Sequence, residues 1–258
     1  MDLQRIKRVG VAAAVNGADV LRKHFGKLRA VRKKEAIDLV TEADLRSEAA
    51  IIETITRAFP EHAILAEESG IRDGNDKRWI VDPLDGTTNF LHGLPHWAVS
   101  IALEHKGEIV AGVIFDAAKD EMFFAEKGTG AWMNESRIRV SGRNRMIEAI
   151  FATGVPFGTK KTLPATLHDL GRLMPQCAGV RRWGSAALDL AYVAAGRYDG
   201  FWERELHAWD IAAGLLIVKE AGGLIGPIRE GHDPLEHGDV LVANEPIYDA
   251  FAKVIRGE

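Results

Sequence analysis

Two aspartates, Asp82 and Asp85, follow the short apolar run Trp79-Ile80-Val81 and precede a turn rich in backbone donors. Pro83 fixes its own φ and biases Asp82 toward an extended conformation, so the pattern predicts a strand that ends at Asp82. Residues 86–89, Gly-Thr-Thr-Asn, suit a tight turn that opens a helix, whose free N–H groups can hold an anion. Carboxylates beside such a turn can hold the hard cations that neutralise phosphate. The pattern indicates a metal-dependent phosphate site, although Asp-Pro-x-Asp-Gly is also ordinary turn chemistry.

Acidic residues recur at two other positions where such a site needs them. Glu67 and Glu68 end the short apolar segment 63–65. Asp210 opens an apolar stretch with helical spacing that runs to the stop signal Gly222-Gly223. This recurrence favours a metal site over an isolated turn.

These motifs resemble those of the inositol monophosphatase family, which is lithium-sensitive and magnesium-dependent. Residues 82–90, Asp-Pro-Leu-Asp-Gly-Thr-Thr-Asn-Phe, agree with the family pattern at every defining position. So do residues 209–214, Trp-Asp-Ile-Ala-Ala-Gly, and the Glu-Ala-Gly-Gly that follows at 220–223. The resemblance covers nearly the whole chain.

The upstream family element is present as Asp-Leu-Val-Thr-Glu-Ala-Asp at residues 38–44. Glu67-Glu68-Ser69 follows it at the expected distance. The family's usual glycine before the two glutamates is Ala66 here, a small departure that leaves the carboxylate in place.

The resemblance implies hydrolysis of a phosphate monoester with two or three Mg²⁺ ions and inhibition by Li⁺. Glu67, Asp82 and the backbone carbonyl of Leu84 match the ligands of a first metal, which polarises the attacking water. Asp82, Asp85 and Asp210 match the ligands of a second metal beside the ester oxygen. Ligands that are all oxygen suit Mg²⁺ better than Zn²⁺, and metal-assisted hydrolysis needs no covalent intermediate.

The resemblance also implies how the water and the phosphate are positioned. Thr87 matches the residue that orients the attacking water together with Glu67, and Asp44 would hold the Thr87 hydroxyl by a hydrogen bond. A solvated or helix-capping carboxylate is the alternative interpretation of Asp44. The backbone N–H groups of Gly86 and Thr87 are expected to bind the phosphate.

The substrate's alcohol part is expected to meet other residues. The segment 184–187, Gly-Ser-Ala-Ala, matches a family turn that opens a helix beside the substrate hydroxyls, and Glu203 matches an acidic residue that hydrogen-bonds an inositol hydroxyl. The alternatives are a plain helix N-cap for Ser185 and a surface carboxylate for Glu203. The expected substrate contacts are Asp85, Gly86, Thr87, Ser185, Ala186, Glu203 and Asp210.

Three nearby charged or titratable residues receive no assigned role. Glu68 is expected to be a structural neighbour, since adjacent residues seldom face the same metal. Lys33 aligns with a basic residue of the family's flap but lies in a run of three basic residues, which is usually a solvated face. His207 is a possible partner of Asp210, but a histidine in the first turn of a helix is common.

The composition fits a cytoplasmic enzyme. With 258 residues, of which 47% are hydrophobic, the chain can bury one large core or two joined lobes. Its net charge of -4 argues against a broad nucleic-acid-binding surface. The lone Cys177 cannot form an intramolecular disulfide or a zinc-ligand set. The N-terminus lacks the apolar core of a signal peptide and no apolar run of 18 residues occurs, so we expect a soluble protein that is not exported.

The elements that must position these residues alternate without a linker or repeat. Hydrophobic spacing predicts helices at 2–25, at 43–58, after Pro164 and from about Ser185, and strands at 97–104, 109–116, 121–125, 148–153 and 178–182. Periodicity alone favours an α+β or α/β fold. The resemblance implies a layered α-β-α-β-α sandwich of the α+β class, with lobes at 1–147 and 148–258 in one catalytic unit.

The implied activity is hydrolysis of myo-inositol monophosphate by a homodimer. The alternative substrates, which relatives handle with the same metal core, are histidinol phosphate, nucleotide 3'-phosphates, NADP and fructose bisphosphate. An alternative of another class is a protein-interaction role, because some bacterial relatives are partners of RNA polymerase and the ribosome-assembly machinery.

Overall fold

The computed structural model describes residues 2–26, 31–33, 39–156 and 161–258, and the side chains of 31–33 and 39–41 are not among those described. The helices are α1 (Leu3–His24), α2 (Glu42–Ala58), α3 (Thr87–Leu91), α4 (Leu163–Leu173), α5 (Ala186–Ala194), α6 (Ala208–Glu220), α7 (Pro234–His237) and α8 (Glu245–Arg256), with 3-10 turns η1 (Met146–Glu148) and η2 (Met174–Gln176). The first strands are β1 (Val31–Lys33), β2 (Leu39–Thr41), β3 (Ala63–Ala66), β4 (Gly70–Arg72), β5 (Lys77–Asp85), β6 (Ala98–His105), β7 (Glu108–Asp116) and β8 (Glu121–Glu126). The remaining strands are β9 (Gly130–Met133), β10 (Ser136–Ile138), β11 (Ile150–Thr153), β12 (Gly179–Arg181), β13 (Gly200–Glu203), β14 (Gly223–Gly226) and β15 (Val240–Asn244).

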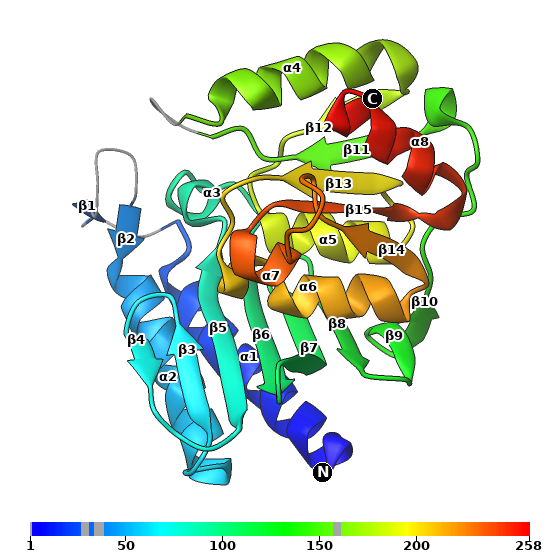
Figure 1. The fold of residues 1–258 in the computed structure, drawn as a ribbon. Coiled ribbons are helices and arrows are strands. Elements are labelled where there is room, and N and C mark those ends of the chain that lie inside the picture. The colour runs from blue at the N-terminus through cyan, green and yellow to red at the C-terminus, as the bar shows by residue number, and fades with distance from the viewer. Residues whose placement is uncertain (1, 27–30, 34–38, 157–160) are drawn as a thin grey trace.

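Helices and sheets stack in alternating layers (Figure 1). An eight-stranded sheet has the order β10-β9-β8-β7-β6-β5-β3-β4, and a five-stranded sheet has the order β12-β11-β13-β15-β14. Helices α1 and α2 cover the outer face of the larger sheet, α5 and α6 lie between the two sheets, and α4 and α8 cover the outer face of the smaller one. The α-β-α-β-α sandwich of the α+β class is therefore confirmed.

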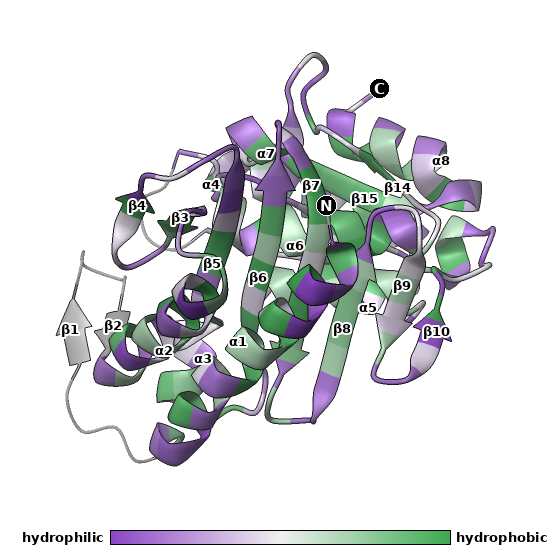
Figure 2. Cartoon of the chain, turned by 90° about the horizontal axis from the view of Figure 1, so that it is seen from below, coloured by the Kyte–Doolittle hydropathy of each residue, from purple (hydrophilic) through white to green (hydrophobic). Residues whose placement is uncertain are grey.

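Alternation along the strands builds these layers, because successive side chains of a strand point to opposite faces. In β5, Trp79 and Val81 pack with α1 and α2, whereas Ile80 packs with α5 and α6. In β13, Phe201 packs on the α5 and α6 side and Trp202 on the α8 side. The inner strands are accordingly apolar on both faces, as Figure 2 shows for β6 to β8.

The middle layer comes very close to the larger sheet. A Cβ built on Gly112 of β7 would lie 2.9 Å from the carbonyl oxygen of Ala213 in α6, so only glycine permits this approach. Both α5 and α6 are buried around most of their circumference, since each has a sheet on either side.

The predicted helices and strands agree with the structure to within about two residues, and β6, β7 and β8 pair in antiparallel fashion. The end of β5 was predicted wrongly, because the strand continues past Asp82 to Asp85. Its pairing with β6 persists as Asp82 opposite Ser100 and Asp85 opposite Ala98, with a register shift between them. Pro83 lies in this irregularity, where its missing N–H costs no ladder bond.

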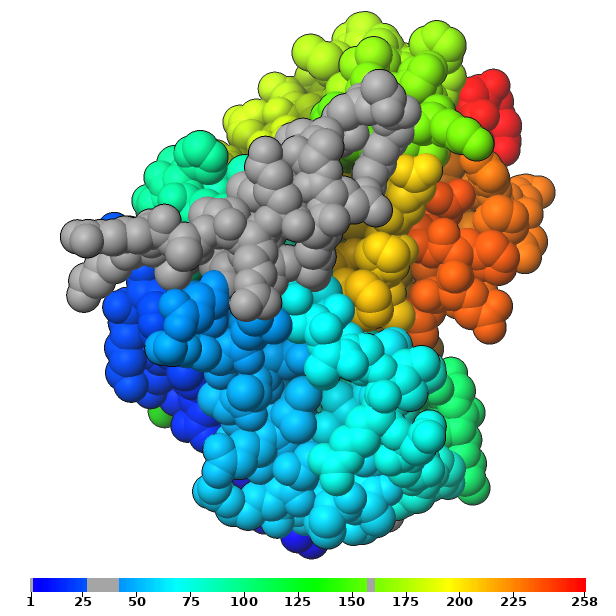
Figure 3. All heavy atoms as spheres, turned by 90° about the vertical axis from the view of Figure 1, so that its left-hand side faces the viewer, coloured from blue at the N-terminus to red at the C-terminus, as the bar shows by residue number. Residues whose placement is uncertain are grey.

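Elements from both halves of the chain adjoin on one face of the molecule. In Figure 3, residues of α2, β3 and β4 form the lower part of this face, and the yellow and orange residues, around 200–240, lie above and to the right. No helix in the described part of the chain is long and apolar enough to cross a membrane.

Candidate active site

Five acidic side chains from four parts of the fold lie in mutual electrostatic contact. Asp44 is in the first turn of α2, Glu67 follows β3, Asp82 and Asp85 end β5, and Asp210 is the third residue of α6. The ends of these elements that carry the acids lie together in the layered fold, so residues far apart in the sequence converge. The structure therefore brings together the acidic residues that the sequence singled out.

Burial and neighbouring charges make ionisation of these acids unfavourable. Burial, followed by the charge of Glu67, raises the pKa of Asp82 well above its ordinary value, and Asp85, Asp210 and Asp44 add to the effect. Burial and then the charge of Asp85 raise the pKa of Asp210 in the same way. Burial raises the pKa of Asp85 to about 6, although a hydrogen bond from Ser185 opposes the shift. A cluster of this kind attracts cations.

Helix α2 positions two of the segments that carry these acids. The Ser47 hydroxyl donates to the carbonyl oxygen of Pro83 at 3.2 Å, and the backbone N–H of Glu68 donates to Oε2 of Glu48 at 2.8 Å. The N–H of Glu67 donates to the carbonyl oxygen of Val81 at 3.1 Å, which continues the pairing of β3 with β5. The backbone at Glu67 is thus fixed against β5 on one side and α2 on the other.

The turn after β5 opens helix α3 as predicted. Gly86 has φ +90°, and a Cβ there would lie 3.0 Å from the carbonyl oxygen of His96, so a side chain is excluded by both conformation and space. The backbone N–H of Leu84 donates to Oδ1 of Asp82 at 2.9 Å. The Thr87 hydroxyl donates to the carbonyl oxygen of Leu84 at 3.0 Å.

This last bond differs from the expectation that Asp44 holds the Thr87 hydroxyl. A hydroxyl has one proton to donate, and the tight turn places the Leu84 carbonyl within reach three residues back. Asp44 lies nearby, since its charge raises the pKa of Asp82. The Leu84 carbonyl, an expected metal ligand, therefore accepts a hydrogen bond from Thr87.

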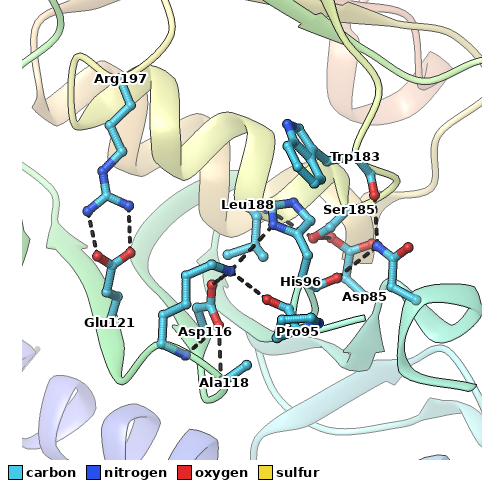
Figure 4. A network of polar contacts seen from close by, with 12 residues as sticks. Asp85, Pro95, His96, Asp116, Ala118, Glu121, Trp183, Ser185, Leu188 and Arg197 are labelled. Atoms are coloured by element: carbon cyan, nitrogen blue, oxygen red, sulfur yellow. Dashed lines mark hydrogen bonds and ion pairs between the residues drawn. The ribbon is translucent and has the colours of Figure 1, made fainter. Parts of the chain in front are cut away.

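Asp85 joins the β5 end to helix α5 (Figure 4). Its Oδ2 accepts from the Ser185 hydroxyl at 2.6 Å and from the backbone N–H of Ala187 at 2.7 Å. The Ser185 hydroxyl also accepts from the N–H of Leu188 at 3.3 Å, so Ser185 is the N-cap of α5 as well as a partner of Asp85. The N-cap interpretation of Ser185 is therefore confirmed.

Asn89 ties the phosphate-binding turn to the same region from the other side. Its Nδ2 donates to the carbonyl oxygens of Trp183 at 2.7 Å and of His96 at 2.8 Å. The segment that holds His96 is itself fixed, because Nζ of Lys119 donates to the Pro95 carbonyl at 2.8 Å and to Asp116 at 2.6 Å (Figure 4). The start of α3 and the turn before α5 are therefore held at a set distance.

The remaining substrate-side residue, Glu203, ends β13. A Cβ built on Gly154 would lie 1.7 Å from Glu203 Oε1, so the carboxylate lies directly over Gly154. Its charge raises the pKa values of both Asp189 and Asp210 after the larger effect of burial. Glu203 is thus within electrostatic range of Asp210 in the acidic cluster.

The donor set fits a hard divalent cation, although its ligands are not gathered into a closed cage. Within the described ranges, no three His, Cys, Asp or Glu side chains are placed to hold a metal by themselves. Oδ2 of Asp85 accepts a hydrogen bond from the Ser185 hydroxyl, and Oδ2 of Asp210 accepts one from the backbone N–H of His207 at 2.6 Å. Mg²⁺ keeps several waters and takes phosphate oxygens as ligands, so it requires few protein groups. Buried oxygen ligands that raise one another's pKa values suit such an ion.

For two of the residues without an assigned role, the structure shows a local structural function. Glu68 gives its backbone N–H to Glu48, and His207 precedes α6 as its N-cap. The side chain of Lys33 and all of Asp38 lie outside the described residues.

Two buried polar residues at the site, Glu48 and Asp189, were not singled out from the sequence, and Asn89 was named only as part of the turn. Glu48 shares the helical spacing of the buried Asp44, Ile51 and Ile55, which is a usable signal for a polar side chain on the core face. Asn89 and Asp189 have no such signal, because their burial depends on elements distant in the sequence.

Comparison with known proteins agrees with this geometry. The inositol monophosphatase family model matches residues 2–257. A protein of Mesorhizobium japonicum named inositol-1-monophosphatase is 48% identical over 252 residues, covering 96% of this chain and 95% of that protein. A Pseudomonas aeruginosa protein named Nus factor SuhB is 42% identical over 262 residues, covering 98% of this chain and 97% of that protein.

Solved structures agree as well. The crystal structure of extragenic suppressor protein suhB from Bartonella henselae has a TM-score of 0.93 and 44% identity, covering 97% of this chain and 98% of that one. An inositol monophosphatase from Anabaena has a TM-score of 0.90 and 37% identity, covering 100% of this chain and 97% of that one. The chain therefore belongs to the inositol monophosphatase family of phosphoric monoester hydrolases.

Proposed function

We propose that this protein hydrolyses myo-inositol monophosphate to inositol and inorganic phosphate with the help of Mg²⁺. The observation that carries the proposal is the convergence of buried Asp82 with the partly buried Asp85 and Asp210, all with raised pKa values, at the glycine turn that begins α3. Bound Mg²⁺ would neutralise the phosphate oxygens and polarise a water, held by Glu67, Asp82, the Leu84 carbonyl, Asp85 and Asp210.

The chain's own groups would orient the reactants. The Thr87 hydroxyl donates its hydrogen bond to the Leu84 carbonyl. The lone pairs of the hydroxyl oxygen can therefore accept a hydrogen bond from the attacking water. Glu67 would accept the second hydrogen of that water. The N–H groups of Gly86 and Thr87 at the start of the turn would hold the phosphate. Asp44 would act through its charge, by holding the pKa of Asp82 high.

The alcohol part of the substrate would meet Glu203, Ser185, Ala186 and Asp85. Carboxylate acceptors suit a polyol, because each hydroxyl offers one proton. This distribution assigns phosphate chemistry to the turn after β5 and substrate selection to the residues around α5 and β13.

A panel of substrates tests this assignment. Phosphate release is measured with and without Mg²⁺ on inositol monophosphate, histidinol phosphate, a nucleotide 3'-phosphate, NADP and fructose bisphosphate. A kcat/KM on inositol monophosphate that exceeds the others supports the proposal. A higher kcat/KM on another compound would identify that compound as the preferred substrate and would leave the proposed metal chemistry unchanged.

The Glu203→Gln variant separates selection from chemistry. We expect it to lower kcat/KM on inositol monophosphate by about 5- to 100-fold, because the amide removes the charge and replaces one of the two acceptor oxygens with a donor, and to spare an aryl phosphate. Equal losses on both substrates would place Glu203 in the catalytic core or the fold.

We further propose that Li⁺ inhibits the enzyme, since a small hard cation suits the same oxygen ligands as Mg²⁺. Uncompetitive inhibition in steady-state kinetics supports this assignment.

A cytoplasmic homodimer is also proposed. Leu94 and Trp183 are about half exposed, and the backbones of both bond to Asn89, which offers a neighbouring apolar surface for self-association. Light scattering of the wild type and of Trp183→Asp tests the dimer.

A second candidate function is interaction with the transcription machinery. It rests on relatives named Nus factor SuhB, such as the Pseudomonas aeruginosa protein. Retention of RNA polymerase by a catalytically inactive Asp82→Asn protein would support this role, and failure of the wild type to bind the polymerase would remove it.

A further inference from the structure

A second cavity lies on the opposite side of the five-stranded sheet from the acidic cluster. It has a volume of about 450 Å³ and opens between α4, α8 and the segment that follows β14. Helices α5 and α6, which begin at Ser185 and His207, pack on the other face of that sheet. Figure 1 shows α4 and α8 side by side in this outer layer. The cavity is therefore separate from the site of phosphate chemistry.

Arginines dominate the cavity wall. Four of them contribute, one from each of four different segments, and the acids that accompany them are Asp169, Glu230 and Glu258. The arginines are Arg172, Arg204, Arg229 and Arg256.

One buried carboxylate serves two of these guanidinium groups. Asp169 is 1% exposed, and its Oδ1 accepts from Arg172 at 2.7 Å while its Oδ2 pairs with Arg204. Nε1 of Trp202 also donates to Oδ2 at 3.3 Å. A single carboxylate therefore serves two guanidinium groups, and Arg172 also donates to the carbonyl oxygens of Val254 and Ile255 at 2.8 Å each.

The other two arginines have only loose ionic partners. Nη1 of Arg256 lies 3.6 Å from Glu230, whose side chain is 82% exposed. Nη2 of Arg256 donates to the Pro227 carbonyl at 3.0 Å, and its Nε is buried without a hydrogen-bond partner among the described residues. Nε of Arg229 lies 3.7 Å from Asp239. Each guanidinium has five N–H donors, so Arg229 and Arg256 keep donor capacity that these distant carboxylates do not take up.

We propose that this cavity binds a small metabolite through two or more oxyanion groups, either phosphates or carboxylates. Guanidinium groups present paired donors that match the oxygens of both groups. The volume is that of a site for a small molecule. Apolar side chains of Ala165, Ile228 and Ile255 line the same cavity and can cover the uncharged part of the ligand.

Titration calorimetry with inorganic pyrophosphate and with citrate tests the proposal and distinguishes a phosphate ligand from a carboxylate ligand. Metal is first removed from the full-length protein with a chelating resin, because the uncompensated carboxylates of the acidic cluster then repel anions. We expect saturable binding of at least one probe with a dissociation constant of about 1 mM or tighter. Binding of pyrophosphate alone identifies a phosphate ligand, and binding of citrate alone a carboxylate ligand.

The variant Arg229→Gln localises the binding. The Arg229 side chain is 66% exposed and has one weak ionic contact, so its loss should leave the fold intact. We expect affinity to fall about tenfold, the usual effect of losing one charge-assisted hydrogen bond. Arg57→Gln is the matched control, because it removes the same charge from the surface of α2, where Arg57 pairs only with Glu53.

Three results would overturn the proposal. One is the absence of saturable binding of either probe to the metal-free wild type. Another is equal affinity in Arg229→Gln and Arg57→Gln. The third is loss of binding in Arg57→Gln, which would show a general charge effect. A melting curve for each variant establishes that it is folded.

Discussion

Asp82 carries a charge that the fold makes unfavourable. Burial and the surrounding acids raise its pKa, so ionised Asp82 opposes folding of the metal-free protein at neutral pH. The same charge is what a bound cation needs. The negative charge that cation binding requires therefore lowers the stability of the metal-free protein, a trade-off typical of catalytic sites.

The variant Asp82→Asn should separate the two demands. Asparagine keeps an oxygen that can accept from the N–H of Leu84, but it removes the charge. We expect kcat to fall at least about 100-fold, because metal-site electrostatics contribute several kcal/mol. We also expect the metal-free melting temperature to rise by about 2–5 °C. Activity within tenfold of wild type would contradict the assignment, and an unchanged or lower melting temperature would contradict the electrostatic argument.

Asp85 should contribute to the pH dependence of the proposed metal binding. Its pKa is raised from 3.8 to about 6, so the proposed metal ligand becomes protonated as the pH falls through 6. The Mg²⁺ concentration for half-maximal activity should therefore rise, by up to about tenfold for each pH unit below 6. Magnesium titrations at pH 5, 6, 7 and 8 measure this.

The stability of the metal-free protein should change in the opposite direction. A raised pKa means that the folded state binds more protons than the unfolded state between pH 3.8 and about 6. The contribution of Asp85 to the free energy of unfolding is thus greatest at low pH and declines as the pH rises through 6. A Mg²⁺ requirement that is flat from pH 5 to 8 would contradict the first prediction, and a metal-free stability that does not decline between pH 3.8 and 6 would contradict the second.

At the scale of elements, Asn89 connects helix α3 with the turn before α5. Asn89→Ala leaves the carbonyls of His96 and Trp183 without this donor, which should loosen the phosphate-binding turn. We expect kcat to fall about 10-fold or more and the free energy of unfolding to fall by about 1–3 kcal/mol. Kinetics and denaturant unfolding measure the two effects.

A matched control for that variant is Asn75→Ala. The Asn75 side chain accepts only a local bond from the N–H of Lys77 at an exposed turn. Its replacement should leave kcat unchanged. If Asn89→Ala lowers stability but not kcat, the link between α3 and α5 matters for folding alone.

Elements whose shape depends on local sequence could be predicted. The apolar run before Asp82 and the glycine turn after Asp85 give β5 and α3, because strand preference and positive φ are properties of a few neighbouring residues. The continuation of β5 through Pro83 could not be predicted in this way. It depends on β6, which keeps pairing with Asp85 across the irregularity.

The same distinction applies to the candidate site. The carboxylates Asp82 and Asp210 stand in recognisable motifs, and their convergence is present in the structure. The partner of the Thr87 hydroxyl and the burial of Asn89 were not predictable from periodicity, because both are set by where the backbone places carbonyl oxygens in three dimensions.

At the scale of the whole molecule, the spacing between layers depends on small residues. Gly112 allows α6 to lie against β7, with Ala213 atoms within 3.0 Å of where a side chain would begin. Gly112→Val should force the layers apart and lower the free energy of unfolding by about 1–3 kcal/mol or more. Gly142→Val is the control, because a Cβ there meets nothing within 4 Å. Equal denaturation midpoints for the two variants would show that the layers are not held at this contact.

The position of α5 and α6 between two sheets has a consequence for biosynthesis. The eight-stranded sheet is complete in the nascent chain once Ile138 has been made, but α5 and α6, which cover its inner face, follow only from Ala186 onward. Until then Ile80, Ile114 and Phe123 have no partners on that face. A ribosome that pauses in this interval presents a broad apolar sheet to solvent, which is the kind of surface that chaperones bind and that otherwise aggregates.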